Sequence, residues 1–206
     1  MRADSAASAI RKAISAGDFE PGEQLIESEM AERLDVSRNT LREAFAMLIA
    51  DGVVVRIRNR GVFIASLGED DVRDLYLARA AIEPAAIAWG QLHDVAGLAD
   101  VVGRAETALA AGRAGEVALA NQQFHRQLVA GMGSATLDET MDRLLAQMRL
   151  VFLQVLRKDP GFHGDYVPVN RHVVELMSAG CYDEAATVLH DSLVRTGRRV
   201  QEILGE

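Results

Sequence analysis

Two short helical segments separated by a three-residue break, and then a basic hairpin, constrain residues 27–64 more than any other part of the chain. Glu27–Leu34 has its apolar residues on one helical face, residues 35–37 interrupt this pattern, and a second helix follows. In residues 53–64, apolar and basic side chains then alternate around a turn, which is typical of a β-hairpin. Together these elements predict a winged helix-turn-helix, in which the second helix enters the major groove of DNA.

The second helix has a recognisable beginning and end. It is expected to begin at Arg38 or Thr40, because Thr40 precedes Glu43 by three residues and this spacing predicts a capping box. Asp51-Gly52 supplies the turn that ends it. Its apolar side chains recur at helical spacing and form the expected buried face, which consists of Leu41, Ala44, Phe45 and Leu48.

The first turn of this helix, which runs from Ser37 through Asn39 to Arg42, carries residue types that read DNA. Arg38 and Arg42 are four residues apart and share a face, so one can pair with guanine while the other holds a phosphate. Thr40 and the helix N-terminus suit a phosphate oxygen. An ordinary solvated helix face explains two arginines equally well, but it does not explain the turn and the hairpin that accompany them.

The hairpin tip and the charge distribution favour the same interpretation. Arg58 or Arg60 can reach a neighbouring groove, and Gly61 permits close approach to the DNA. The whole chain of 206 residues has a net charge of −8, but residues 38–60 hold five arginines and two acids. Residues 18–35, in contrast, hold seven acids and one base. An acidic protein with one cationic patch can bind DNA at that patch and be repelled elsewhere.

The remaining two thirds of the chain predict helices alone. Aromatic residues make up 5% of the sequence and alanine and leucine are abundant, which favours helices over a β-sandwich or barrel. The predicted fold is mainly α: a winged helix-turn-helix with a small β wing in residues 1–66, and an antiparallel all-α bundle of about six helices in residues 67–206. The six expected helices cover about 69–92, 96–111, 115–131, 136–158, 166–179 and 182–204.

Several classes of protein are excluded by composition. Cys181 is the single cysteine, so a disulfide framework and a cysteine-rich zinc module are excluded and a reducing, cytoplasmic setting is expected. No apolar run approaches about 18 residues, and the first residues lack the apolar segment of a signal peptide. A helical-bundle metalloenzyme would need Glu-x-x-His pairs, and the sequence has none, so the protein is not expected to be an enzyme.

The sequence resembles the GntR family of transcriptional regulators over nearly its whole length. The N-terminal resemblance lies in residues 21–25 (PGEQL), 30–45 (MAERLDVSRNTLREAF) and 48–54 (LIADGVV). The C-terminal part is similar to the all-helical FadR-type domain of the family, in residues 74–79 (DLYLAR), 83–84 (EP), 121–125 (NQQFH) and 179–186 (AGCYDEAA).

The resemblance implies a homodimer that binds a pseudo-palindromic DNA operator and is controlled by a small molecule. It places Arg38, Asn39, Thr40, Arg42 and the wing pair Arg60-Gly61 at family DNA-contact positions. Many members read Ser-Arg-Thr-Pro-Val-Arg at the recognition helix, whereas residues 39–41 here are Asn-Thr-Leu, so the operator sequence is not implied. We expect a repressor rather than a sensor that keeps this fold without specific DNA binding.

Helical domains of this type often hold a divalent metal such as Zn, Ni or Mn, which the resemblance also implies. The family ligands are Asp or Asn, a His four residues later, and two more His from the last two helices. Asn121 and His125 match the first two positions. Counting residues along the last two helices from Gly180 places Asn170 and Ser192 at the third and fourth ligand positions. His172 and His190 do not fall at these positions and are expected to point away from the site.

The predicted inward-facing set of Asn121, His125, Asn170 and Ser192 contains one strong metal ligand. Three interpretations remain open: a metal held by His125 with Asn121, a core histidine with its hydrogen bonds satisfied, or a polar cluster that binds an organic effector directly. We favour the last of these, with no cofactor required.

Arg79 supports the effector interpretation. It lies on the apolar face of its helix, and a buried guanidinium needs an anion. Glu83, one turn further on, is the internal partner expected on structural grounds alone. The functional alternative is that Arg79 binds an effector carboxylate in a bidentate manner, and both can hold if Glu83 orients Arg79. Small organic acids are frequent effectors in similar domains.

Overall fold

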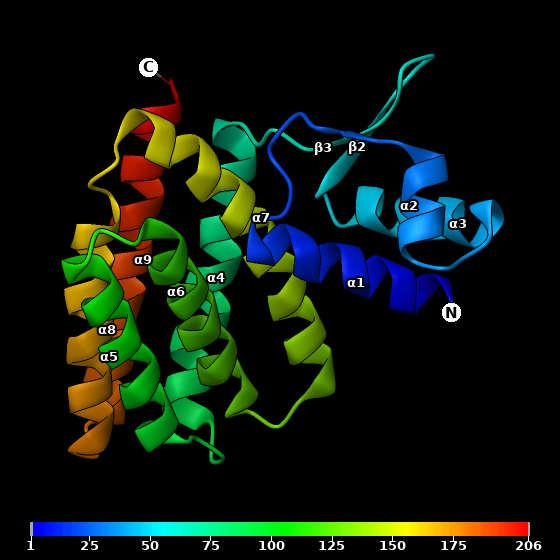
Figure 1. Ribbon diagram of the computed structural model, residues 1–206. Coiled ribbons are helices and arrows are strands. Elements are labelled where there is room, and N and C mark those ends of the chain that lie inside the picture. The colour runs from blue at the N-terminus through cyan, green and yellow to red at the C-terminus, as the bar shows by residue number, and fades with distance from the viewer. Residues whose placement is uncertain (1, 206) are drawn as a thin grey trace. The chain divides into compact units, whose positions relative to one another are not determined.

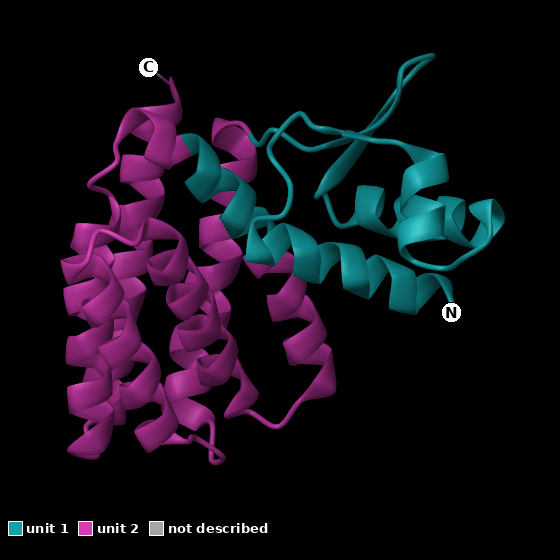
Figure 2. Ribbon diagram, viewed as in Figure 1, with its two compact units in different colours: residues 1–67, 146–154 teal, residues 68–145, 155–206 magenta. Residues whose placement is uncertain are grey.

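The computed structural model describes residues 2–205, which form nine helices and three strands in two compact units (Figures 1 and 2). The N-terminal unit contains the residues up to 67 together with 146–154, and the helical unit contains 68–145 and the residues from 155 onward. The elements are α1 (Ala3–Ala16), β1 (Gln24–Leu25), α2 (Glu27–Arg33), α3 (Arg38–Ala50), β2 (Val54–Ile57), β3 (Gly61–Ile64), α4 (Glu69–Trp89), α5 (Val95–Ala110), α6 (Ala114–Ala130), α7 (Ala135–Lys158), α8 (His163–Ser178) and α9 (Tyr182–Gly205).

The core of the N-terminal unit lies between α1 and α3. The two helices pack along each other, and α2 packs against α3 as the first helix of the predicted helix-turn-helix. An ion pair between Arg11 of α1 and Asp51 at the end of α3 joins the two helices. Because α3 buries its apolar face, its polar face is left toward solvent. The buried side chains are Ala6, Ala7, Ile10 and Ile14 of α1 and Leu41, Ala44, Phe45 and Leu48 of α3.

The cap of α3 differs from the predicted one. Ser37, not Thr40, is the N-cap, and its hydroxyl oxygen accepts a hydrogen bond of 3.1 Å from the backbone N–H of Thr40. The helix therefore begins at Arg38, and Thr40 already lies inside its first turn. Glu43 accepts a hydrogen bond from Asn39 instead of closing a capping box. The predicted capping box at Thr40 is wrong, because Ser37 meets the same chemical requirement three residues earlier. Arg38, one of the two predicted first residues of the helix, is confirmed as its start.

The wing is a three-stranded antiparallel sheet with the strand order β1-β3-β2. The hairpin of β2 and β3 pairs Val54 with Ile64 and Ile57 with Gly61, as the alternating pattern predicts. Asn59 and Gly61 have φ angles of 61° and 112°, and the left-handed backbone at the tip favours these residue types. Strand β1 was not predicted, because its two residues are too few to show alternation.

The helical unit is built from α4 to α9, and the prediction of about six helices is confirmed. Helix α9 packs against α4 and α8, while α5 packs against α6 and α8 (Figure 1). At Gly197 of α9 the backbone approaches α4 so closely that a Cβ atom would lie 2.8 Å from Cβ of Tyr76. A glycine at this position therefore lets the two helices come into close contact.

Helix α7 contributes to both units. Its residues 146–154 belong to the N-terminal unit, where Gln147 donates a hydrogen bond of 2.7 Å to the backbone carbonyl of Asp51. The remainder of α7 belongs to the helical unit. The division of the sequence into domains 1–66 and 67–206 stays a prediction about separately folding parts. None of the described helices is long and apolar enough to cross a membrane.

Candidate DNA interface and ligand site

The polar face of α3 presents the predicted DNA-reading side chains to solvent. Arg38, Asn39 and Arg42 are exposed, and Thr40 is half-buried beside the Ser37 cap. Nε of Arg42 donates a 3.0 Å hydrogen bond to a carboxylate oxygen of Glu27, at the start of α2. Among residues 2–205, no ion pair engages Arg38. Arg38 therefore has no acidic partner to give up on binding DNA, whereas Arg42 would first have to leave Glu27.

The wing tip is held in place while its cations stay exposed. The side-chain amide of Gln24 in β1 donates a 2.9 Å hydrogen bond to the carbonyl of Arg60, and a Cβ atom on Gly61 would lie 3.1 Å from this amide. The guanidinium of Arg60 lies 5.6 Å from the ring centroid of Phe63. Arg58 is exposed beside it, and so is Arg56 on β2, which was not among the predicted DNA contacts. The unpredicted strand β1 thus positions the tip.

These elements suit duplex DNA in size and charge. An α-helix with its side chains is about 10–12 Å across, and the major groove is about 12 Å wide. The N-terminal turn of α3 is free of acidic residues, so Arg38 and the helix dipole both attract phosphate. The arrangement can therefore place α3 in the major groove and the wing against the neighbouring backbone.

A chain of buried charged groups links α4 to α6 in the helical unit. Arg79 is 1% exposed and Glu83 is fully buried, and Nε of Arg79 donates a hydrogen bond of 2.7 Å to one Glu83 carboxylate oxygen. The other carboxylate oxygen lies 2.6 Å from Nδ1 of His125. The guanidinium also lies 5.1 Å from the ring centroid of Tyr76. The internal partner of Arg79 is therefore Glu83, and Glu83 in addition fixes the His125 ring.

Burial and pairing set the charge states in this chain. Burial alone would raise the pKa of Glu83, but Arg79 and His125 outweigh it and hold that pKa below its usual range. Burial lowers the pKa of His125, and the charge of Glu83 opposes this only in part. Burial also raises the pKa of Tyr76 to about 12. The cluster thus contains one cation, one anion and a neutral imidazole that donates from Nδ1 and leaves the lone pair on Nε2 as an acceptor.

Two amide side chains extend the cluster. Asn121 lies one helical turn before His125 on α6, and its carbonyl oxygen accepts a 2.9 Å hydrogen bond from the amide nitrogen of Asn170 on α8. Ser192 on α9 is also buried, but among the described residues no hydrogen bond joins it to the others. The structure thus joins Asn121 to Asn170, and Arg79 to His125 through Glu83.

The donor set does not fit the divalent metal that the resemblance implies. In the part of the chain that is described, no group of three or more His, Cys, Asp or Glu residues is placed to hold a metal ion. His172 and His190 are exposed and lie beside Glu175 and Asp191, respectively. Asn170 and Ser192 take the buried positions instead, so His125 is left as the single imidazole of the cluster.

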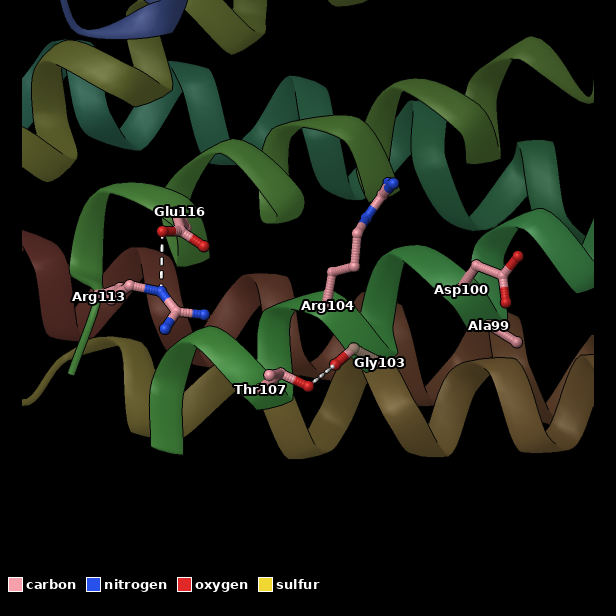
Figure 3. Close-up of a pocket in the computed structure, with 7 residues that line it drawn as sticks. All are labelled: Ala99, Asp100, Gly103, Arg104, Thr107, Arg113 and Glu116. Carbon is pink, nitrogen blue, oxygen red and sulfur yellow. Dashed lines mark hydrogen bonds and ion pairs between the residues drawn. The ribbon is translucent and has the colours of Figure 1, made fainter. Parts of the chain in front are cut away.

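A separate groove of about 530 Å³ lies on the surface of the helical unit, between α5 and α6 (Figure 3). In this groove, Arg113 forms a 2.8 Å ion pair with Glu116, and Arg104 donates a 2.7 Å hydrogen bond to Gln123. None of the residues predicted for the ligand site lines this groove, so we keep the buried cluster as the candidate ligand site. The groove is lined by Ala99, Asp100, Gly103, Arg104, Thr107, Arg113 and Glu116.

Comparisons with known proteins agree with this arrangement. Residues 2–64 match the model of bacterial regulatory proteins of the gntR family, and residues 74–195 match the FCD domain. An HTH-type transcriptional regulator from Agrobacterium vitis is 35% identical over 136 residues, which cover 63% of this chain and 80% of that protein. The Escherichia coli transcriptional repressor GlaR is 31% identical over 156 residues, which cover 70% of this chain and 71% of the repressor.

Solved structures show the same architecture. A GntR transcriptional regulator from Rhodococcus sp. RHA1 superposes with a TM-score of 0.83 at 32% identity and covers 96% of both chains. The Escherichia coli protein McbR/YncC, at 16% identity, shares the fold with a TM-score of 0.81 over 97% of both chains. The two family models cover most of the chain, and the relatives are regulators rather than enzymes. This protein therefore belongs to the GntR family, as a DNA-binding transcriptional regulator with an FCD effector-binding domain.

Proposed function

We propose that this protein is a repressor, acting in the cytoplasm as a homodimer on a pseudo-palindromic operator, and that a small organic acid bound in its helical unit releases it from DNA. The DNA contacts are Ser37, Arg38, Asn39, Thr40 and Arg42 of the recognition segment and Arg58, Arg60 and Gly61 of the wing. Two-fold symmetry of the dimer implies the symmetry of the operator. GlaR, a relative similar to both units, carries the name of repressor.

Buried Arg79 is the observation that carries the organic-acid effector. A guanidinium has five N–H donors, and the hydrogen bond to Glu83 uses the one on Nε. Its terminal nitrogens form a planar fork that matches a carboxylate. Glu83 thus orients Arg79 without excluding a second anion. Asn121, His125, Asn170 and Ser192 supply further polar groups to the same ligand.

The effector acts through its different affinities for two arrangements of the dimer. A ligand shifts an equilibrium only as far as it binds one state better than the other. We propose that the acid favours an arrangement in which the spacing of the two α3 helices no longer matches the operator half-sites. The free energy of acid binding at the buried cluster then lowers the affinity of the dimer for its operator.

Substitution of Arg79 by lysine tests the effector assignment. Lysine keeps a positive charge for Glu83 but lacks the planar fork, so acid binding is expected to weaken at least about tenfold. The measurement screens mono- and dicarboxylic acids for a rise in the unfolding temperature of the wild type. Each active acid is then titrated against the protein–operator complex, with the wild type and Arg79→Lys in parallel.

The expected result is that an acid releases the wild type from DNA and that Arg79→Lys needs a higher concentration of the same acid. Arg113→Lys in the α5–α6 groove is the matched control and responds like the wild type. An identical response of Arg79→Lys and the wild type would remove Arg79 from the ligand site. Expression of a reporter gene placed downstream of the operator distinguishes a repressor from an activator. A repressor lowers this expression, whereas an activator would raise it.

A further inference from the structure

We propose that the buried cluster of the helical unit binds its ligand through direct hydrogen bonds, with no metal ion between the ligand and Asn121, His125 and Asn170. The inference rests on the proposed ligand-binding function of this cluster. It goes further in that it names the chemistry of the contact: beside Arg79, one imidazole and two amides hydrogen-bond a polar organic molecule directly, rather than through a chelated metal.

The orientation of His125 limits what the ring can offer. Its Nδ1 lies 2.6 Å from the carboxylate of Glu83, so only Nε2 is left to face another group. A carboxylate behind a histidine is also common in metal sites, where it orients the ring. This contact alone therefore does not exclude a metal, and the other groups of the cluster decide the question.

The two amides are engaged with each other. The carbonyl oxygen of Asn121, the atom with which it would bind a metal, accepts the hydrogen bond from Asn170. A neutral amide oxygen is a weak ligand for Zn²⁺ and Ni²⁺, which prefer imidazole, thiolate and carboxylate. The amide nitrogen of Asn121 and the carbonyl oxygen of Asn170 remain as one donor group and one acceptor. Together with Nε2 they match a ligand that carries both a hydroxyl or amino group and a carbonyl or carboxyl group.

The charges of the cluster also oppose a divalent cation. Its single carboxylate, Glu83, is already shared by Arg79 and His125. A divalent ion would enter a buried region whose one carboxylate already balances a guanidinium, with no further anion to neutralise the added charge. The side-chain types in the cluster therefore exclude the metal, whereas the positions of the helices do not. Replacing the two amides by strong ligands should then create a metal site.

The test is a calorimetric titration of chelator-treated protein with Zn²⁺ and with Ni²⁺. For the wild type we expect no stoichiometric site in the micromolar range, only weak binding that the His172→Ala/His190→Ala variant loses. The Asn121→Asp/Asn170→His variant places one carboxylate and two imidazoles together, which suffices for a zinc site completed by water. We expect it to bind one ion per chain at least about a hundredfold more tightly than the wild type, with a rise in unfolding temperature.

Stoichiometric, micromolar binding by the wild type that His125→Ala abolishes would overturn the proposal. A folded Asn121→Asp/Asn170→His variant that gains no affinity would overturn the claim that side chains alone exclude the metal. If that pair of substitutions unfolds the protein, Asn170→His alone is expected to gain about tenfold. DNA release by carboxylates, measured with chelator present, separately tests the proposed function, because its failure would leave the metal titration unchanged.

Discussion

Replacing Arg79 by alanine is expected to destabilise the helical unit by about 3–5 kcal/mol, because it leaves the Glu83 carboxylate buried without its cation. The side chains of Arg79 and Glu83 are 2% and 0% exposed, so water cannot take over the role of the guanidinium. His125 keeps its contact with Glu83, but burial disfavours its charged form. Urea unfolding followed by far-UV circular dichroism measures the effect.

The Arg79→Met/Glu83→Gln variant is the control for this prediction. It removes both charges, and the glutamine side chain that it introduces can still accept a hydrogen bond from His125. Replacing both members of a buried ion pair is often neutral, so the double variant should recover much of the stability that Arg79→Ala loses. An Arg79→Ala protein as stable as the wild type would show that Glu83 is not confined as the structure describes.

The second large effect is expected at the DNA interface, where Arg38→Ala should reduce binding of operator DNA to the level of unrelated DNA. A bidentate contact between arginine and guanine is worth about 1–3 kcal/mol, and a dimer loses it in both half-sites. Arg38 lies in the exposed first turn of α3, where its loss leaves no buried group unpaired. Fluorescence anisotropy with a labelled duplex, selected from a random library with the wild type, measures the affinity.

Arg113→Ala is the matched control, because it removes the same charge from the surface of the helical unit. Its ion pair with Glu116 is exposed and contributes little to stability. The control should bind the operator as the wild type does, and both variants should retain the wild-type unfolding temperature. Wild-type affinity and sequence preference in Arg38→Ala would show that another residue reads the bases.

The N-terminal part of the fold was predictable because its signals are local. The break at residues 35–37, the apolar spacing in α3 and the alternation in β2 and β3 each arise from neighbouring residues. The exact cap was not predictable, since Ser37 and Thr40 both satisfy the chemistry of an N-cap and only the final start of α3 selects between them. Strand β1 exists because β3 offers it a partner, which a two-residue sequence cannot reveal.

The ligand cluster was predictable only in part. Helical spacing indicates which side chains of one helix point inward, and it places Asn170 inside and His172 outside. It also pairs Arg79 with Glu83, because these residues are one turn apart. The link from Glu83 to His125 spans 42 residues and joins two helices, and the Asn121–Asn170 hydrogen bond spans 49. Tertiary packing decides such contacts, and no local pattern encodes them.

The salt-dependent affinity of the wild type for two duplexes of equal length tests the central claim most directly. One duplex is the sequence selected from the random library, and the other is a permutation of its bases. We predict that the selected duplex binds at least about a thousandfold more tightly at physiological salt, and that affinity for both falls as salt rises. Equal affinity for the two duplexes, or selection that yields no common sequence, would contradict the account.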